Sequence, residues 1–182
     1  MIPHLRRLGV PLPWRDLGLP EVWTSRGTTL DEAATWSWGW AGEGPDLGIP
    51  EAPDRTGTVL EDPWIDHVVL LVPRLDEALD RFAAIGLSPR LRMEVGGRPA
   101  AFFRVGPVLE VVSAPVRAPS LYGVALATAE HLEAVALRWR AGGFEVSDPR
   151  PALQPGRRIL TVRGLHAGLA MMSPDVQIPK MS

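Results

Sequence analysis

Hydrophobic residues recur in short, regular runs from residue 64 onward. The run WIDHVVLLV (64–72) has the length and composition of a strand, and it ends at Pro73, which cannot donate to a sheet ladder. The next segment, residues 74–87, carries apolar side chains at helical spacing, and Gly86 is placed to end the helix. The pattern therefore begins as one strand followed by one amphipathic helix.

Three more strands follow this helix. Residues 88–95 alternate weakly, residues 96–98 predict a turn, and the runs 100–105 and 108–112 predict a hairpin around Gly106–Pro107. The first unit is thus β-α-β-β-β.

The same unit occurs a second time. Residues 120–128 predict a strand, and residues 131–144 align without a gap on the helix at 74–87, so that Trp139 falls on Phe82 and Gly143 on Gly86. The further strands of this copy are predicted at residues 144–148, 157–162 and 168–172. Two copies of one supersecondary unit indicate a duplicated module.

The first 60 residues follow neither pattern, and they hold five of the seven tryptophans among many Gly and Pro residues. Thr29 followed by Glu32 forms a capping box, which predicts a short helix within residues 28–38 and irregular chain around it. A disordered tail would be poor in aromatic residues, so we expect a strap or lid packed on the domain. The alternative is that the tryptophans only cover a sheet edge.

The composition of the chain argues against several classes of partner and catalytic site. The 182 residues are 46% hydrophobic and 22% charged, the profile of a soluble globular protein, and the net charge of −2 argues against nucleic acid as a partner. The absence of Cys excludes thiolate nucleophiles and Cys-based metal sites. No secretory signal and no membrane-spanning run is recognisable, which favours a cytoplasmic protein without a membrane partner. Phosphate-loop, dinucleotide-fingerprint, HExxH and G-x-S-x-G motifs are absent.

Two polar residues stand out on apolar strand faces. By alternation His67 shares a face with Val69, and Glu110 shares one with Val108. An ionised carboxylate on such a face needs a partner, for which a metal ion, an Arg or a protonated His67 would serve. Three roles for His67 stay open: metal ligand, general base or substrate contact, and a structural histidine paired with Glu110 or a carbonyl.

Other polar and aromatic side chains are candidates for contacting a ligand. An inward-facing Arg suits an anionic or carbonyl group, although a solvated outer face is the alternative for each Arg. Two tryptophans would face the same way in an extended chain and suit stacking on a flat ligand. The candidate substrate-binding residues are Trp38, Trp40, Arg92, Phe102, Arg104 and His166.

The tandem repeat, opening on IDHVVLLV and closing its first unit on VLEVV, resembles the vicinal oxygen chelate superfamily over residues 64–174. The resemblance implies an α+β fold in which two βαβββ modules form a half-barrel cup of the glyoxalase and bleomycin-resistance type. On this basis the chain is expected to divide into an N-terminal Trp-rich extension (1–60), two modules (61–117 and 118–174) and a C-terminal tail (175–182). It also implies a homodimer.

The resemblance also implies a divalent metal in the cup, held by the first and fourth strands of each module. Carried over to this chain, the ligands are His67 and Glu110, whereas the second module has Gly123 and Ala170 in the matching places. Three protein ligands are normal for a catalytic site, and His166, the N-terminal segment or a partner chain are the sources left for a third. The expectation is one Zn, Mn, Ni or Fe ion, or no metal at all.

Two leading functions therefore remain open, beside a structural or regulatory module that uses the cup for protein contacts. One is a lyase or isomerase that binds a small oxygenated metabolite, with His67 and Glu110 as catalytic residues. The other is a metal-free protein that sequesters a drug or natural product, as bleomycin-binding relatives do. The fold itself does not decide between them.

Overall fold

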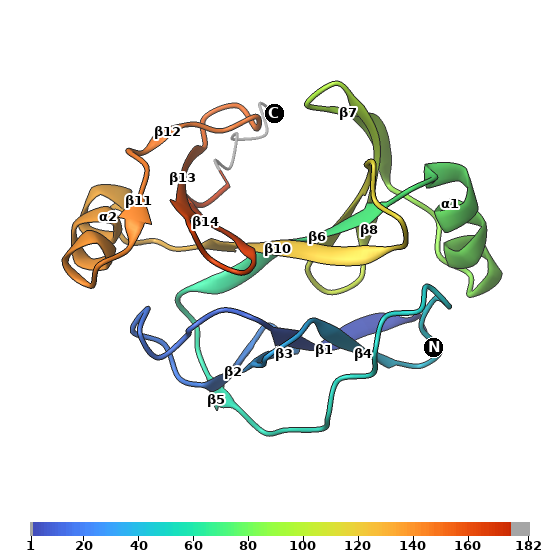
Figure 1. Ribbon diagram of the computed structural model, residues 1–182, viewed down its shortest axis with the longest axis horizontal. Helices are drawn as coiled ribbons and strands as arrows, with labels where there is room; N and C mark the ends of the chain where they lie inside the picture. The colour runs from blue at the N-terminus through green and yellow to red at the C-terminus, as the bar shows by residue number, and fades with distance from the viewer. Residues whose placement is uncertain (1, 176–182) are drawn as a thin grey trace, which may run out of the picture.

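Two packed β-sheets form the framework of residues 2–175, which are the residues that the computed structural model describes. The larger sheet contains the two predicted modules and curves into a cup, with a helix on the outer side of each wall (Figure 1). The smaller sheet comes from the N-terminal segment and lies beneath the larger one in this view.

Each module has the predicted βαβββ order. The first consists of β6 (Trp64–Val72), α1 (Leu75–Ala84), β7 (Leu91–Val95), β8 (Arg98–Arg104) and β9 (Val108–Ser113). The second consists of β10 (Ser120–Ala127), α2 (Leu132–Ala141), β11 (Glu145–Val146), β12 (Arg150–Pro151), β13 (Arg158–Arg163) and β14 (Gly168–Met172). The short β12 is an addition that pairs with β13.

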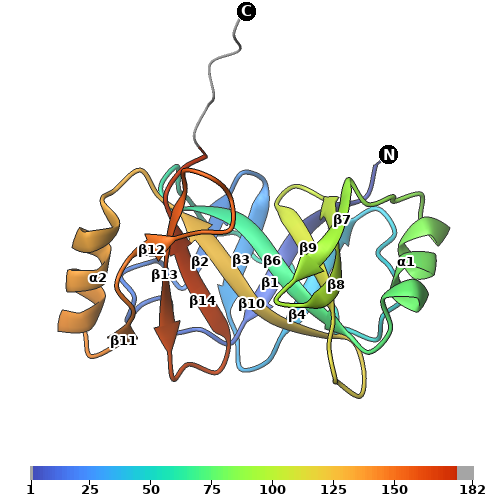
Figure 2. The ribbon, with the colours of Figure 1, turned by 90° about the horizontal axis from the view of Figure 1, so that it is seen from above.

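The main sheet has the order β11-β13-β14-β10-β6-β9-β8-β7, so the first strands of both modules are neighbours at its centre. They run antiparallel, with Val68 opposite Val124, and each is parallel to the last strand of its own module. The view from above (Figure 2) shows the two modules side by side, with α1 and α2 at opposite ends. The predicted duplication is therefore confirmed as an internal pseudo-twofold arrangement.

Both helices are followed by a glycine with a positive φ angle. Gly86 and Gly143 both have positive φ, at 78° and 91°, a conformation that glycine adopts without a steric cost. Phe82 and Trp139, which the repeat pairs with each other, are both buried against the sheet.

The N-terminal segment corrects two predictions. Instead of irregular chain around a helix it forms five strands, in the order β4-β1-β3-β2-β5. Their bounds are β1 (His4–Val10), β2 (Val22–Ser25), β3 (Thr28–Glu32), β4 (Ser37–Ala41) and β5 (Thr58–Val59).

The predicted helix within residues 28–38 is wrong because a hairpin forms there. Ser25 pairs with Thr28 across Arg26 and Gly27, both of which have positive φ, as a two-residue turn between strands requires. Thr28 is then buried and its hydroxyl donates to the Leu5 carbonyl at 2.8 Å. The hairpin pairing and this tertiary hydrogen bond prevail over the local capping signal.

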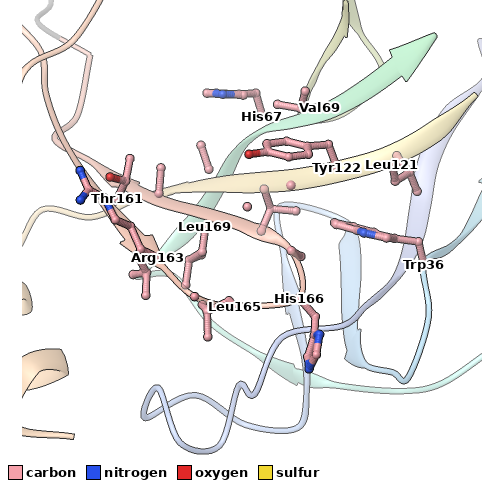
Figure 3. Close-up of a pocket in the computed structure, with 18 residues that line it drawn as sticks. Trp36, His67, Val69, Leu121, Tyr122, Thr161, Arg163, Leu165, His166 and Leu169 are labelled. Carbon is pink, nitrogen blue, oxygen red and sulfur yellow. The ribbon is translucent and has the colours of Figure 1, made fainter. Parts of the chain in front are cut away.

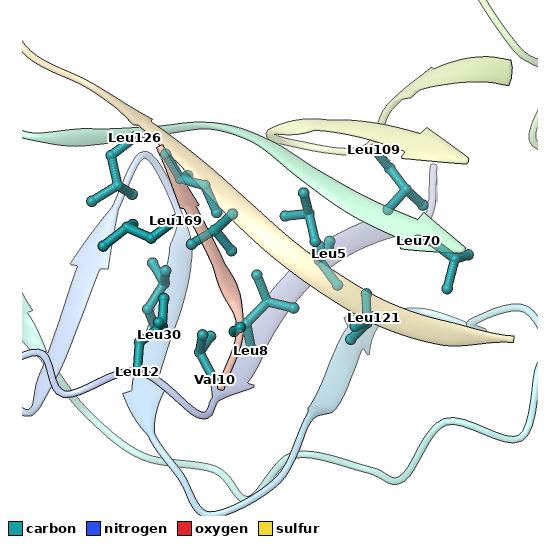
Figure 4. Packing of buried hydrophobic residues seen from close by; sticks show 14 of the residues in the cluster. Leu5, Leu8, Val10, Leu12, Leu30, Leu70, Leu109, Leu121, Leu126 and Leu169 are labelled. Carbon is teal, nitrogen blue, oxygen red and sulfur yellow. The ribbon is translucent and has the colours of Figure 1, made fainter. Parts of the chain in front are cut away.

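The N-terminal sheet packs against the convex side of the main sheet. Leucines of both sheets interdigitate without solvent access, as Figure 4 shows for Leu5, Leu8 and Leu30 on one side and Leu70 and Leu126 on the other. The segment is thus a second layer of the domain and not a strap across the mouth of the cup. No helix within residues 2–175 is long and apolar enough to cross a membrane.

The shared core predicts that the N-terminal sheet stabilises the whole domain. Leu8→Ala, at a side chain with 0% exposure between the sheets, should lower the free energy of unfolding by about 2–5 kcal/mol. Urea unfolding followed by tryptophan fluorescence measures this. Leu153→Ala, at a side chain with 79% exposure, is the control and should change it by less than about 0.5 kcal/mol. An equally small effect of Leu8→Ala would contradict a common core.

Candidate functional site

A β-bulge in β6 brings Asp66 and His67 to the same side of the sheet. His67 lies opposite Ala125 and Ile65 lies opposite Leu126, so Asp66 is an extra residue without a partner on β10. Strict alternation would place Asp66 and His67 on opposite faces. The bulge removes that alternation at one point, and their side chains meet, with His67 Nδ1 2.8 Å from Asp66 Oδ2.

Arg157 holds the other oxygen of Asp66. Its Nη2 donates to Asp66 Oδ1 at 2.8 Å and its Nε donates to the Ser173 carbonyl at 3.0 Å. The Arg157 side chain is only 4% exposed, so the ion pair is shielded from solvent. Burial acts to raise the pKa of Asp66, but the hydrogen bonds and charges of His67 and Arg157 outweigh it and lower the pKa below its usual value. Asp66 is therefore an ionised carboxylate at neutral pH.

Glu110 lies on the other side of the imidazole. It is the neighbour of Val69 in the parallel pairing of β6 with β9, and its Oε2 lies 3.7 Å from His67 Nε2, beyond hydrogen-bond range. Burial raises the pKa of Glu110, an effect that the charge of His67 only partly offsets. The imidazole thus lies between one carboxyl group that stays ionised and one that is biased toward holding a proton.

This asymmetry favours one tautomer of His67. An ionised Asp66 accepts the hydrogen bond of Nδ1–H, which leaves Nε2 facing Glu110 with its lone pair in the neutral imidazole. The arrangement suits proton transfer at Nε2, because Asp66 stabilises the imidazolium that forms and Glu110 is close enough to exchange a proton after small movements.

The cup beside His67 contains a cavity of about 680 Å³. Its floor is formed by small cup-facing residues of β10 and β14: Gly123, Ala125, Gly168 and Ala170. Figure 3 shows the labelled lining, with His67 and Tyr122 near one another, Thr161 and Arg163 on β13, and Trp36 at the opposite end. A mostly apolar cavity with a few polar groups is typical of a small-molecule site.

Tyr122 owes its position to a second bulge. Leu121 lies opposite Leu70 and Gly123 opposite Val69, so Tyr122 is the extra residue on β10. Its ring lies over Gly168, where an added Cβ would come within 2.8 Å of the Tyr122 Cε1 atom. The ring is 55% exposed and is available to a ligand in the cavity.

The predicted ligand-contacting residues lie in different places. Phe102 and Arg104 are on the same face of the sheet as Glu110, because they pair with Glu110 and Val108. Arg92 pairs with Ala101, on the opposite face, so its predicted ligand contact is not supported.

The predicted tryptophan pair also lies away from the cavity. Trp38 is 4% exposed and meets Trp40 edge to face at 5.3 Å, within the N-terminal sheet. Trp36 lines the cavity in their place. His166 lines it as well, but Figure 3 shows its ring at the lower end, away from His67.

The donor set does not fit a metal held by three protein ligands. The strand register confirms which residues correspond: His67 and Val69 lie beside Val108 and Glu110, and the equivalent places in the second module carry no donor. The residues there are Gly123, Ala125, Gly168 and Ala170. His67 presents one nitrogen to each carboxylate, so the three groups share no common centre, and residues 2–175 contain no cluster of three His, Asp or Glu suited to a metal.

The sequence pattern did not identify several residues of this site, among them Asp66, Arg157 and Tyr122. Asp66 was visible beside His67, but its role depends on the bulge. Arg157 is far from both in the chain, and nothing in its local sequence points to Asp66. Tyr122 is an ordinary strand residue by pattern, and only the second bulge turns it toward the cavity.

Comparison with known proteins supports the fold. No family model matches the chain, and no curated protein matches it. A solved hypothetical protein from Bacillus halodurans C-125 superposes with a TM-score of 0.53 at 14% identity, covering 66% of this chain and 100% of that one. The chain therefore shares the fold of this protein, with two βαβββ modules of glyoxalase-like type.

Two epimerases are among the other structural neighbours. Methylmalonyl-CoA epimerase from Mycobacterium tuberculosis has a TM-score of 0.49 at 18% identity, covering 62% of this chain and 88% of that one. A Streptomyces coelicolor methylmalonyl-CoA epimerase in complex with 2-nitronate-propionyl-CoA has a TM-score of 0.48 at 17% identity, covering 62% and 97%. At these identities the likeness extends to the fold alone.

The raised pKa of Glu110 predicts a pH-dependent stability cost. Below its ordinary pKa of 4.5 the Glu110 carboxyl is protonated in both the folded and the unfolded chain, and its burial carries no ionisation cost. As the pH rises through the raised pKa of the folded state, the carboxyl ionises in a buried place and the folded state loses stability. The Glu110→Gln side chain cannot ionise. The free energy of unfolding of this variant should therefore rise relative to that of the wild type as the pH increases from 4 to 7. Urea unfolding across this range measures the difference. The exposed Glu145→Gln is the control, and a flat difference for Glu110→Gln would contradict the assignment.

Proposed function

We propose that this protein is an enzyme of isomerase or lyase type that moves a proton on a small oxygenated metabolite held in the cup. The observation that carries the proposal is the placement of His67 between Asp66 and Glu110 at the edge of the cavity. A titratable base oriented by a buried ion pair, next to a carboxyl group of raised pKa, is a typical arrangement for acid–base chemistry.

The proposed roles follow from the contacts. His67 Nε2 takes a proton from a carbon next to a carbonyl group, and the carbanion is held as an enolate. Glu110, whose pKa burial raises, is the group that returns a proton to the enolate from its protonated form. The imidazolium then gives its proton to the Glu110 carboxylate, which restores both groups and leaves no net change in protonation.

Other residues support this step without taking a proton. Asp66 is a positioning residue that keeps His67 in one tautomer, and Arg157 keeps Asp66 ionised. Tyr122, Thr161 and Arg163 line the cavity and offer hydrogen-bond donors to a substrate carbonyl or carboxylate. The step as written needs only the residues of this chain, in keeping with a donor set that does not fit a three-ligand metal.

The test does not require the substrate to be known in advance. Carbonyl metabolites, including 2-oxo acids, hydroxyketones and acyl thioesters, are incubated with the protein in D₂O, and NMR follows deuterium entering the carbon next to the carbonyl. His67→Gln should slow this exchange by about 10²–10⁴-fold, since it removes the base. Asp66→Asn should slow it less and shift its pH profile, since it removes only the orienting charge.

Two controls complete this experiment. The exposed Glu133→Gln should exchange at the wild-type rate, and treatment with a chelator should leave the rate unchanged. Equal rates for the wild type and His67→Gln would contradict the proposed role of His67. Loss of exchange with the chelator, and its recovery with Zn, Mn, Ni or Fe(II), would contradict chemistry carried by protein groups alone.

The second candidate function is the sequestration of an aromatic compound without turnover. It is favoured by the small-residue floor of the cavity and by the exposed face of Tyr122, with Trp36 at the far end. The aromatic contacts come from these two residues and not from the predicted pair Trp38 and Trp40, which lie in the N-terminal sheet.

This function predicts a different pattern of variants. Tyr122→Ala should weaken the binding of a fluorescent aromatic sulfonate by about tenfold, as loss of one stacking contact would. His67→Gln should leave the affinity nearly unchanged, and Trp40→Phe is the control for an aromatic change outside the cavity. Titration followed by fluorescence measures all three, and an unchanged affinity of Tyr122→Ala would contradict stacking on this ring.

A further inference from the structure

The cavity beside His67 is larger than the reacting carbonyl group of a substrate needs. Its volume of about 680 Å³ falls within the range of roughly 300–1,000 Å³ that holds drug-sized molecules. His67 lies at one end of it, whereas Trp36 and His166 line it away from His67 (Figure 3). A molecule that fills the cavity therefore has a second part, which lies at a distance from the reacting carbon.

A gap beside β10 connects the cup with the far end of the cavity. In the parallel pairing of β10 with β14 the first pair is Gly123 with Gly168, although β10 already begins at Ser120. Leu121 and Tyr122 therefore have no partner on β14, and both line the cavity. The cavity passes the start of β14 at this point and extends toward the N-terminal sheet.

Trp36 comes from outside the two modules and has a fixed position. It directly precedes β4, whose first residue, Ser37, is buried and pairs with Gly9 of β1. On the other side of β4 the backbone N–H of Trp38 donates to the Pro50 carbonyl at 2.9 Å. Trp36 itself is half-buried, because it packs against the core and also lines the cavity. A rigid element thus presents the indole ring to a ligand.

The side chains at this end determine which kind of group fits there. Leu165, in the turn between β13 and β14, is half-buried like Trp36 and lines the cavity with it. An indole ring and an aliphatic side chain offer apolar surface on which an aromatic ring stacks. None of the described residues that line the cavity is Asp or Glu, whereas Arg163 and two histidines are among them. This lining favours a neutral or anionic compound over a cationic one.

We propose that Trp36 is a specificity-determining residue, which together with Leu165 forms a far subsite for the aromatic group of an aryl-substituted carbonyl compound. The carbonyl end of this compound lies at His67, an assignment that rests on the proposed function. Occupation of the far subsite requires binding alone. The N-terminal sheet thereby contributes to the choice of substrate, in addition to its part in the core.

Paired 2-oxo acids test this preference. Acids with a terminal phenyl group on a chain of four, five or six carbons are each compared with the same chain without the phenyl group, in the D₂O exchange experiment. The wild type should show a higher kcat/KM for the phenyl compound in at least one pair. Trp36→Leu keeps an apolar side chain against the core and should reduce this preference about tenfold, mainly through KM. Trp36→Phe keeps an aromatic ring and should retain most of the preference.

A second measurement separates the far subsite from catalysis. 6-Phenylhexanoate lacks the reactive carbonyl group and cannot be turned over, so calorimetric titration measures its affinity directly. Trp36→Leu should bind it about tenfold more weakly than the wild type. Trp40→Leu is the matched control, since Trp40 is also half-buried near β1 but does not line the cavity, and it should bind like the wild type. The indole N–H signal of Trp36, assigned by its loss in Trp36→Phe, should shift in NMR spectra during the titration.

The two measurements distinguish this proposal from the proposed catalysis. If no compound exchanges deuterium but Trp36→Leu weakens the binding of 6-phenylhexanoate, the catalytic proposal fails and the far subsite is supported. The far subsite is overturned if the wild type does not bind 6-phenylhexanoate or if Trp36→Leu binds it as tightly as the wild type. Exchange that proceeds without any preference for the phenyl compounds would overturn the role of Trp36 in specificity.

Discussion

The antiparallel pairing of β6 with β10 is the interaction on which the rest of the structure depends. It joins the two modules into one sheet, and one face of the joined strands buries Val68, Leu70, Val124 and Leu126 against the core. The other face forms the centre of the cup. Both irregularities of this pairing, the bulges at Asp66 and Tyr122, deliver a side chain to the candidate site.

The site combines unequal contributions from two equivalent modules. The first provides His67 and Glu110, and the second provides small residues that leave room for a ligand. The second module also supplies Arg157, which reaches across to Asp66 and keeps it ionised. The duplicated fold thus carries a polar chain, Arg157–Asp66–His67–Glu110. The two carboxyl groups beside the imidazole differ in pKa because burial raises that of Glu110, whereas at Asp66 the hydrogen bonds from His67 and Arg157 outweigh burial.

The N-terminal sheet completes the molecule on its convex side. Its leucines and tryptophans bury the face that the two modules alone would expose, and Trp139 of α2 donates to the Leu17 carbonyl at 3.0 Å. The segment also sends Trp36 to the end of the cavity.

The sequence by itself determined both modules, because apolar periodicity and the glycines at 86 and 143 are local signals that burial and backbone sterics impose directly. It also singled out His67 and Glu110, since a polar group on an apolar strand face needs a reason. Tertiary structure decided the rest. Despite the capping box at Thr29, this segment forms a hairpin in which the Thr28 hydroxyl donates to the Leu5 carbonyl. The Asp66 side chain contacts His67 only because the register of β6 with β10 shifts by one residue. Arg157 became part of the site through a contact between residues 91 positions apart, which no local pattern encodes.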